Sequence, residues 1–357
     1  MELKKTYKIL SILLVMQWAF IQIIAQYPEF IEQYYSNGLY LYISKLLRII
    51  FGWLPFSIGD ILYTILGIII IKGIYTSIKT KKLNFRNTFF KTGAILSILF
   101  FFFNFNWGLN YLRQPITEIL GFEKTEYNSN ELISFTKEII LKSNQIHYSI
   151  AKNDTILIEN NLTKQQIREI SPLAYKQLEL KYPQFKFENA SIKNSLFSIP
   201  LTYMGFAGYI NPITNEAQVN SLIPKNSYPA TVCHEIAHQV GIGSESEANF
   251  VGYLAATHSE NANYKYAGYL MATRYCLGEV YRTEPEQFDI LVASLNKGIR
   301  KDLQNSQDFW ASYQNWSEKF FKIFYDSFLK ANMQKDGIKG YSKMVSLLIN
   351  YYKTEQL

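Results

Sequence analysis

The N-terminal part of the chain consists of long apolar runs separated by short polar or basic stretches. Three of these runs are long enough to cross the hydrocarbon core of a bilayer as helices. They cover residues 10–25, 58–75 and 92–111. A fourth run, residues 39–53, contains Lys45 and Arg48, and these charges favour a helix at the membrane surface over a further span. We therefore predict a membrane domain over residues 1–112 with three transmembrane helices.

The charges around these runs predict their orientation. Lys4, Lys5 and Lys8 precede the first run, and a basic loop at residues 79–86 joins the second run to the third. Loops rich in lysine and arginine remain on the cytoplasmic side of a membrane. We therefore predict an integral, multi-pass cell membrane protein with a cytoplasmic N-terminus and an extracytoplasmic domain over residues 113–357.

The pattern after residue 112 is that of a soluble domain rich in helices. Residues 130–151 and 163–181 carry helix-period apolar positions, and Pro172 is expected to kink or divide the second helix. Short runs between Pro and Asn turns then predict strands at 191–199, 204–210 and 216–222. Beyond residue 249 the helix period returns at 263–281, 284–303, 308–329 and 337–352. The predicted fold is mostly α, with a small sheet in an α+β outer domain and a helical C-terminal half.

Composition narrows the classes of partner. The formal net charge is +7, but the basic residues are scattered and several flank the apolar runs. This distribution favours membrane lipid as a partner and argues against nucleic acid. The chain has two cysteines, which do not make a disulfide framework, and Cys233 is expected to be a packing residue.

The candidate chemistry lies in the pattern H-E-x-x-H at His234, Glu235 and His238. Residues four apart share one face of a helix, so the two imidazoles can point at one metal ion. Glu235 projects from the neighbouring edge, where it can take a proton from a water activated by that metal. Gly241 and Gly243 are expected to end this helix. The alternative is an amphipathic helix whose two histidines are ordinary surface or core residues.

A third ligand is expected just downstream, because catalytic zinc usually takes three protein ligands and leaves one position open. Ser244 is a poor ligand, whereas Glu245 and Glu247 are both suitable. Ser244 and Glu247 also fit a capping box at the start of a second helix, which gives Glu247 a competing role. We therefore favour Glu245, with Glu247 as the alternative. Asn249 shares the face of Glu245 and is expected to orient a ligand.

The residues from Glu245 to Asn249 resemble the E-x-x-A-D signature of membrane-associated gluzincin metallopeptidases, such as the prenyl-protein protease and heat-shock membrane protease groups. Asn249 replaces their Asp, and the two motifs lie closer together here. The block HEIAHQ…ESEANF and the apolar runs before it resemble, more closely, a family of bacterial multi-pass membrane proteins with a zincin-like domain. The resemblance implies Glu245 as the third Zn²⁺ ligand, a zincin-like outer domain and a metallopeptidase acting on a peptide or protein.

Together these features predict a membrane-anchored zinc metallopeptidase. His234, His238 and Glu245 would bind Zn²⁺, and Glu235 would act as the catalytic base. In zincins an edge strand pairs with the substrate backbone, and we expect that groove at Gly205, Gly208 and the strand at 216–220; a plain structural hairpin is the alternative. A further donor to the oxyanion is expected but unassigned: Arg274, Tyr275, Tyr281 and Arg282 follow the motif, and nothing in the sequence selects one of them.

Two other functions are considered. A non-catalytic membrane scaffold or receptor that retains a zincin-like fold is the main alternative, because a fold does not guarantee its function. A transporter is disfavoured, because only three spans are expected and they carry no cluster of intramembrane charges. His147 and His258 are expected to be structural or surface residues rather than ligands.

Overall fold

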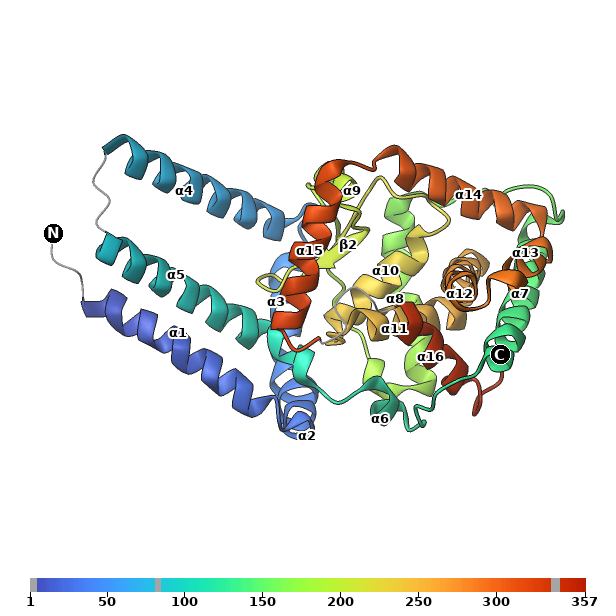
Figure 1. Ribbon diagram of the computed structural model, residues 1–357, viewed down its shortest axis with the longest axis horizontal. Coiled ribbons are helices and arrows are strands. Elements are labelled where there is room, and N and C mark those ends of the chain that lie inside the picture. Colours follow the sequence, from blue (N-terminus) through green and yellow to red (C-terminus); the bar gives the residue numbers. More distant parts are fainter. Residues whose placement is uncertain (1–4, 81–84, 335–340) are drawn as a thin grey trace.

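The computed structural model describes residues 5–80, 85–334 and 341–357, and these residues are mostly helical (Figure 1). Three helices are long and apolar enough to cross a membrane, namely α1 (Lys5–Ile24), α4 (Ile58–Thr80) and α5 (Phe85–Asn106). The three apolar runs are thus confirmed as helices. Lys4 and the middle of the predicted basic loop, residues 81–84, lie outside the described residues.

The third predicted span is too long at its C-terminal end. The α-helix α5 ends at Asn106, and the chain continues into a short 3₁₀ helix, η2 (Gly108–Leu112). Trp107 is only 2% exposed and packs against the outer domain. The domain boundary at residue 112 stays a prediction. Residues before the boundary make many contacts with residues after it.

The predicted surface helix is part of a longer helical stretch made of α2 (Pro28–Phe30), a π-helix η1 (Ile31–Leu39) and α3 (Tyr40–Gly52). One face of α3 is buried against the outer domain through Tyr40, Ser44 and Arg48. The Arg48 guanidinium donates to the Asn215 side chain at 2.9 Å and to the Gln239 carbonyl at 3.2 Å. Arg48 is therefore a buried link to the outer domain and not the membrane-surface charge that the sequence suggests.

Two buried carboxylates fix the N-terminus of α4 to the sheet. Glu216 accepts from the backbone N–H of Gly59 at 2.6 Å, and Asp60 accepts from that of Leu196 at 2.7 Å. Asp60 also accepts from the Tyr209 hydroxyl. The Glu216 contact is stable because the free N–H groups and dipole of a helix N-terminus attract negative charge.

The sheet has three short strands in the order β1-β3-β2. They are β1 (Ile192–Asn194), β2 (Gly208–Ile210) and β3 (Ala217–Val219). β1 runs parallel to β3, and β2 runs antiparallel to it with Tyr209 opposite Gln218. The predicted first strand is too long, because residues 198–204 form α9 (Ser198–Met204). Short apolar runs do not distinguish strand from helix by periodicity alone, and α9 is such a run.

The outer domain is built from helices around the sheet. They are α6 (Ile116–Leu120), α7 (Ser129–Ala151), α8 (Lys164–Lys181), η3 (Pro183–Phe185), α10 (Tyr228–Gln239), α11 (Glu245–His258), α12 (Ala262–Thr283), α13 (Pro285–Ala293), α14 (Lys297–Ser312), α15 (Trp316–Ala331) and α16 (Tyr341–Tyr351). The described residues after α10 contain no strand, so the helical C-terminal half is confirmed. α10 and α11 lie in the main core, where Val232, Phe250 and Tyr253 are fully buried.

Two helix boundaries differ from those predicted. Pro172 lies inside α8 without dividing it, and that helix begins with a capping box between Thr163 and Gln166. The predicted helices at 284–303 and 308–329 are instead α13, α14 and α15. Asn296 and Asn315 immediately precede the last two of these helices. The Asn296 backbone N–H donates to the Asn144 side chain. The Asn315 side chain donates to the Tyr203 carbonyl and accepts from the Ser317 N–H at the start of α15.

Candidate metal centre

The helix that carries the motif ends in a turn that the glycine makes possible. Gly241 has φ +90°, and its N–H donates to the His238 carbonyl at 3.1 Å. The N–H of Ile242 donates to the Ala237 carbonyl at 3.0 Å, which completes a Schellman turn. Only glycine adopts this backbone conformation without strain. The prediction that α10 ends at Gly241 is confirmed.

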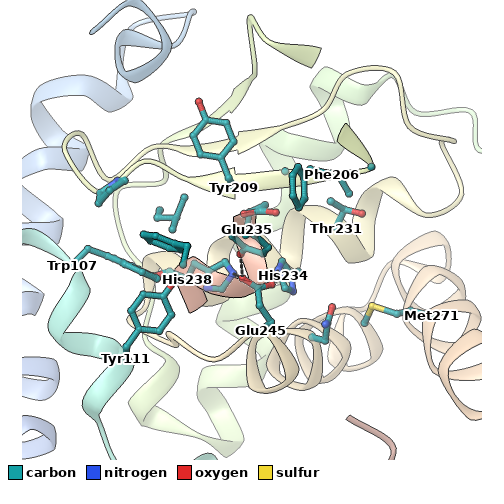
Figure 2. Close-up of a pocket in the computed structure, with 18 of the residues that line it drawn as sticks. Trp107, Tyr111, Phe206, Tyr209, Thr231, His234, Glu235, His238, Glu245 and Met271 are labelled. Carbon is teal, nitrogen blue, oxygen red and sulfur yellow. Dashed lines mark hydrogen bonds and ion pairs between the residues drawn. The ribbon is translucent and has the colours of Figure 1, made fainter. Parts of the chain in front are cut away.

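The turn returns the chain so that the first residue of α11 faces the two histidines (Figure 2). Glu245 places Oε2 3.4 Å from His234 Nε2 and Oε1 3.6 Å from His238 Nε2. The imidazole centroids of the histidines lie 4.7 Å apart. Glu235 has a carboxylate oxygen within 4.8 Å of both imidazoles. The structure therefore brings all four predicted site residues together.

The ligand atoms are spaced as a metal ion requires. On a tetrahedral ion with bonds of about 2.0–2.1 Å, neighbouring ligand atoms lie about 3.3–3.4 Å apart, close to the separations between Glu245 and the histidines. His238 Nδ1 lies 2.7 Å from the carbonyl of Ile242, which can only accept a hydrogen bond. Nδ1 therefore carries a proton, and Nε2 is the nitrogen whose lone pair a metal ion would take in place of a proton. These residues form a group that can hold a metal ion.

The charges of the site are strongly coupled. Burial lowers the pKa of the His238 imidazole, but the Glu245 carboxylate outweighs this effect and raises the pKa to about 9. Burial raises the pKa of Glu245, but His238 and His234 together hold it well below its usual range. The charge of the Glu245 carboxylate is thus balanced by the protonated His238 imidazole, and a divalent cation held by the same side chains would balance it instead.

Glu235 lies apart from this pairing, beneath strand β2. Its side chain is buried, and Oε2 has no hydrogen-bond partner in the described part of the chain. Burial raises its pKa to about 7. A Cβ atom on Gly208 would lie 2.4 Å from Glu235 Oε1, so glycine is required where β2 crosses the carboxylate. This carboxylate is thus directed at the space beside the strand edge.

Glu247 has a different neighbour, and the predicted capping box is wrong. Ser244 is the N-cap of α11 but its side chain makes no capping hydrogen bond. The Glu247 carboxylate accepts from the backbone N–H of Ile116 at 3.1 Å. Burial raises the pKa of Glu247. The residue that the structure places against the histidines is therefore Glu245, while Asn249 lines the adjacent cavity.

A cavity of about 500 Å³ opens beside the site. Its walls include the segment from Gly205 to Ile210 and many aromatic side chains. These aromatic residues are Tyr63, Phe103, Trp107, Tyr111, Phe206, Tyr209, Tyr275, Tyr325 and Phe328. Among the proposed oxyanion donors, Arg274 and Tyr275 line the cavity. Tyr281 is 65% exposed and Arg282 pairs with Glu279, and neither residue lines the cavity.

Two side chains at the site were not anticipated from the sequence. The Tyr325 hydroxyl of α15 donates to Glu245 Oε1 at 2.6 Å, and the Trp107 indole donates to the His238 carbonyl at 3.0 Å. Both come from segments far from the motif in sequence. The nearest signal is the period of α15, in which Tyr325 lies opposite the face of Phe320 and Phe324. His147 and His258 bond to the carbonyls of Ile156 and Leu254, away from the cavity, as expected.

The C-terminal end of α10 is capped by residues from the N-terminal part of the chain. The Tyr40 hydroxyl donates to the Gln239 carbonyl at 3.0 Å, and Arg113 donates to the Gly241 carbonyl at 2.9 Å. Arg113 also forms a buried ion pair with Glu32 at 2.6 Å. Donors and cations at this end complement the free carbonyls and the dipole of the helix. The position of the ligand helix therefore depends on contacts with the segments around α3 and α5.

The fold and the site together define a mostly helical protein with three helices able to cross a membrane and a His–Glu group able to hold a metal ion. The chain belongs to the family described as "Protein of unknown function (DUF3810)", which matches residues 35–349. No curated protein and no solved structure matches the chain. The zincin-like relationship stays a prediction, and the activity has to be argued from the site.

Proposed function

We propose that the protein is a membrane-anchored zinc metallopeptidase whose outer domain is extracytoplasmic. The observation that carries the proposal is the convergence of Glu245 on His234 and His238, with the buried carboxylate of Glu235 beside them. Two imidazoles and one carboxylate are a common ligand set for catalytic zinc, and they leave a position open for the reaction. The orientation follows from the basic residues around the apolar runs.

The proposed proton transfer is carried out by Glu235. Zinc, when bound, would polarise both the attacking water and the scissile carbonyl. Glu235 would accept the proton of that water on its carboxylate and later deliver it to the leaving amine. Its lack of a hydrogen-bond partner among the described residues is consistent with this role, because the carboxylate is then available to the reacting groups. Arg274 and Tyr275 are the proposed donors to the developing oxyanion.

The open edge of β2 supports a peptide as the substrate. The Ala207 carbonyl accepts from Asn220, and Asn211 donates to the Glu216 carbonyl, so alternate residues of this segment pair with β3. Antiparallel pairing then directs the N–H and C=O groups of Gly208 and Ile210 away from β3, and both residues line the cavity. An extended peptide can add to such an edge.

The proposed groove therefore involves fewer segments than the sequence suggests. The strand predicted at 216–220 cannot form the open edge, because β3 is the central, buried strand with a partner on each side. Gly208 and Gly205 both line the cavity, Gly205 at the end of α9, and the proposal keeps both residues in the groove.

Three glutamine variants of the full-length protein test the proposal. We expect Glu235→Gln to retain zinc while cleavage of a degenerate peptide library falls by about 10²–10⁴-fold, because it lacks the base. Glu245→Gln should lose zinc, because a neutral amide is a poorer ligand. Glu247→Gln is the matched control, since its amide oxygen still accepts from Ile116. Zinc is measured by elemental analysis and cleavage by mass spectrometry.

Two outcomes would contradict the proposal. Equal zinc in the wild type and in His238→Ala would remove the metal centre. A zinc-loaded wild type that cleaves neither peptides nor membrane proteins would instead support a non-catalytic scaffold or receptor.

A further inference from the structure

The cavity lies at the level where the candidate spans meet the outer domain. Tyr63 is in the second turn of α4 and Phe103 is in the last turn of α5, and both line the cavity. Trp107, just beyond α5, contacts His238 directly, with ring centroids 5.8 Å apart. If α4 and α5 cross a bilayer, these residues lie at its outer surface. The metal ligands are then within one or two side chains of that surface.

Helix α15 separates the cavity from the side of the domain that faces the candidate spans. Its inner face contributes Tyr325 and Phe328 to the cavity and buries Leu329. Its outer face is also apolar and strongly exposed, with Trp316 89%, Phe320 66%, Ile323 67% and Phe324 66% exposed. Lys319, Lys322 and Lys330 lie along one border of that face, where Lys322 pairs with Glu318 and Lys330 pairs with Asp326. An apolar face bordered by lysines is typical of a helix lying in a membrane interface.

A second exposed apolar face lies on α3. Its exposed side chains are Leu41, Tyr42, Leu46, Ile49, Ile50 and Trp53. Figure 1 shows α3 and α15 at the end of the outer domain from which α1, α4 and α5 extend. Both exposed apolar faces thus lie on helices at the end of the domain next to the candidate spans, where a bilayer crossed by those spans would cover them.

We propose that α15 lies in the outer membrane interface and that the metal centre consequently acts on membrane-anchored polypeptides close to the bilayer surface. The substrate class rests on the proposed peptidase function. Tyr325 connects α15 to the metal site, because its hydroxyl bonds to Glu245 from the inner face of that helix. A helix with its side chains is about 10 Å thick, which an extended chain covers in about three residues. The scissile bond should therefore lie only a few residues from the membrane-embedded part of the substrate.

Quenching by brominated lipids tests the position of α15 independently of activity. A single cysteine replaces Ile323 in the full-length protein, is labelled with a fluorescent dye, and is reconstituted in phosphatidylcholine and phosphatidylglycerol vesicles. The native cysteines, Cys233 and Cys276, are buried and do not compete for the label. Asn305→Cys on α14 provides the exposed control. We expect strong quenching at 323 and none at 305. Equal, weak quenching at both positions would overturn the proposal.

Matched substrates test the substrate class in the same vesicles. One cleavable sequence, selected from the peptide library, is presented free, or fused to a transmembrane segment through a spacer of about three or about twenty residues. We expect the short-spacer substrate to be cut at least about tenfold faster than the free peptide, because membrane anchoring raises its local concentration. Equal rates for all three would overturn the inference. If no peptide is cut, the peptidase function fails, while the quenching still decides where α15 lies.

Discussion

The two walls of the cavity differ in composition and in origin. The metal wall, formed by His234, Glu235, His238 and Glu245, is polar and comes from two consecutive helices. The aromatic wall is assembled from three segments far apart in the sequence. It includes Tyr63, Phe103, Trp107, Tyr111, Tyr325 and Phe328. The metal wall carries the proposed chemistry, whereas the aromatic wall contacts the proposed ligands and includes residues of the candidate spans.

This difference separates two kinds of variant. Changes on the metal wall should abolish metal binding or turnover while the fold persists. Changes in the contacts between the walls should act through stability or through the orientation of a ligand, because Trp107 and Tyr325 reach the metal wall by hydrogen bonds. The following predictions test that separation.

The largest expected effect is a loss of stability at Arg113, which caps the C-terminal end of the helix that carries the two histidines. Arg113 and Glu32 are 6% and 9% exposed at their side chains, so Arg113→Met leaves a buried carboxylate without its partner. We expect a loss of about 3–5 kcal/mol in the free energy of unfolding, measured by denaturation in detergent. The double variant Arg113→Met with Glu32→Leu should recover most of this loss. Lys45→Met, which removes an exposed ion pair with Glu188, is the control and should change little.

The next prediction concerns the contact between β2 and the base. In Gly208→Ala the new methyl group would lie 2.4 Å from Glu235 Oε1 and 2.6 Å from the backbone carbonyl oxygen of Gln218, so the carboxylate and strand β2 must shift apart. We expect turnover to fall by about 10²-fold, since a shift of about 1 Å in a catalytic group has that effect, while zinc content is unchanged. Gly278→Ala is the control, because its Cβ meets no atom within 4 Å. Unchanged turnover in Gly208→Ala would contradict the position assigned to Glu235.

The smallest effect is expected for the tyrosine that orients the third ligand. Tyr325→Phe removes the donor to Glu245 and keeps the ring in the cavity. Loss of such a supporting hydrogen bond should weaken zinc affinity by about 10–100-fold, as measured by competition with a zinc-binding dye. Tyr281→Phe is the matched control on the exposed surface. A loss of zinc affinity no larger than that of the control would show that Tyr325 does not orient Glu245.

Local spacing was sufficient to predict which residues of the metal wall come together, because the contacts among those four residues are made within one helix or across one turn. The histidines, the stop at Gly241 and the return of Glu245 toward His238 follow from the helix period and glycine chemistry. The same local reasoning failed for Glu247. Its partner is the backbone of Ile116, 131 residues away, and no local pattern reports such a contact.

The aromatic wall was not predicted for a related reason. Trp107 and Tyr325 belong to apolar helical patterns in which lipid contact and burial against the domain give the same sequence signal. Arg48 illustrates the converse case, since a cation in an apolar run suggests a water-facing position but can also be satisfied by buried carbonyls. The membrane segments were therefore identified from sequence as helices, but their contacts with the outer domain required the structure.

The capping of α10 by the N-terminal segments has a consequence for biogenesis. Tyr40, Trp107 and Arg113 are synthesised before the ligand helix, and their donors meet the carbonyls of Gln239, His238 and Gly241 only when the outer domain folds against them. A fragment released without these residues would leave those carbonyls to water and lose the fixed end of the helix. The proposed metal centre would then form only in a chain whose N-terminal helices already lie against this domain.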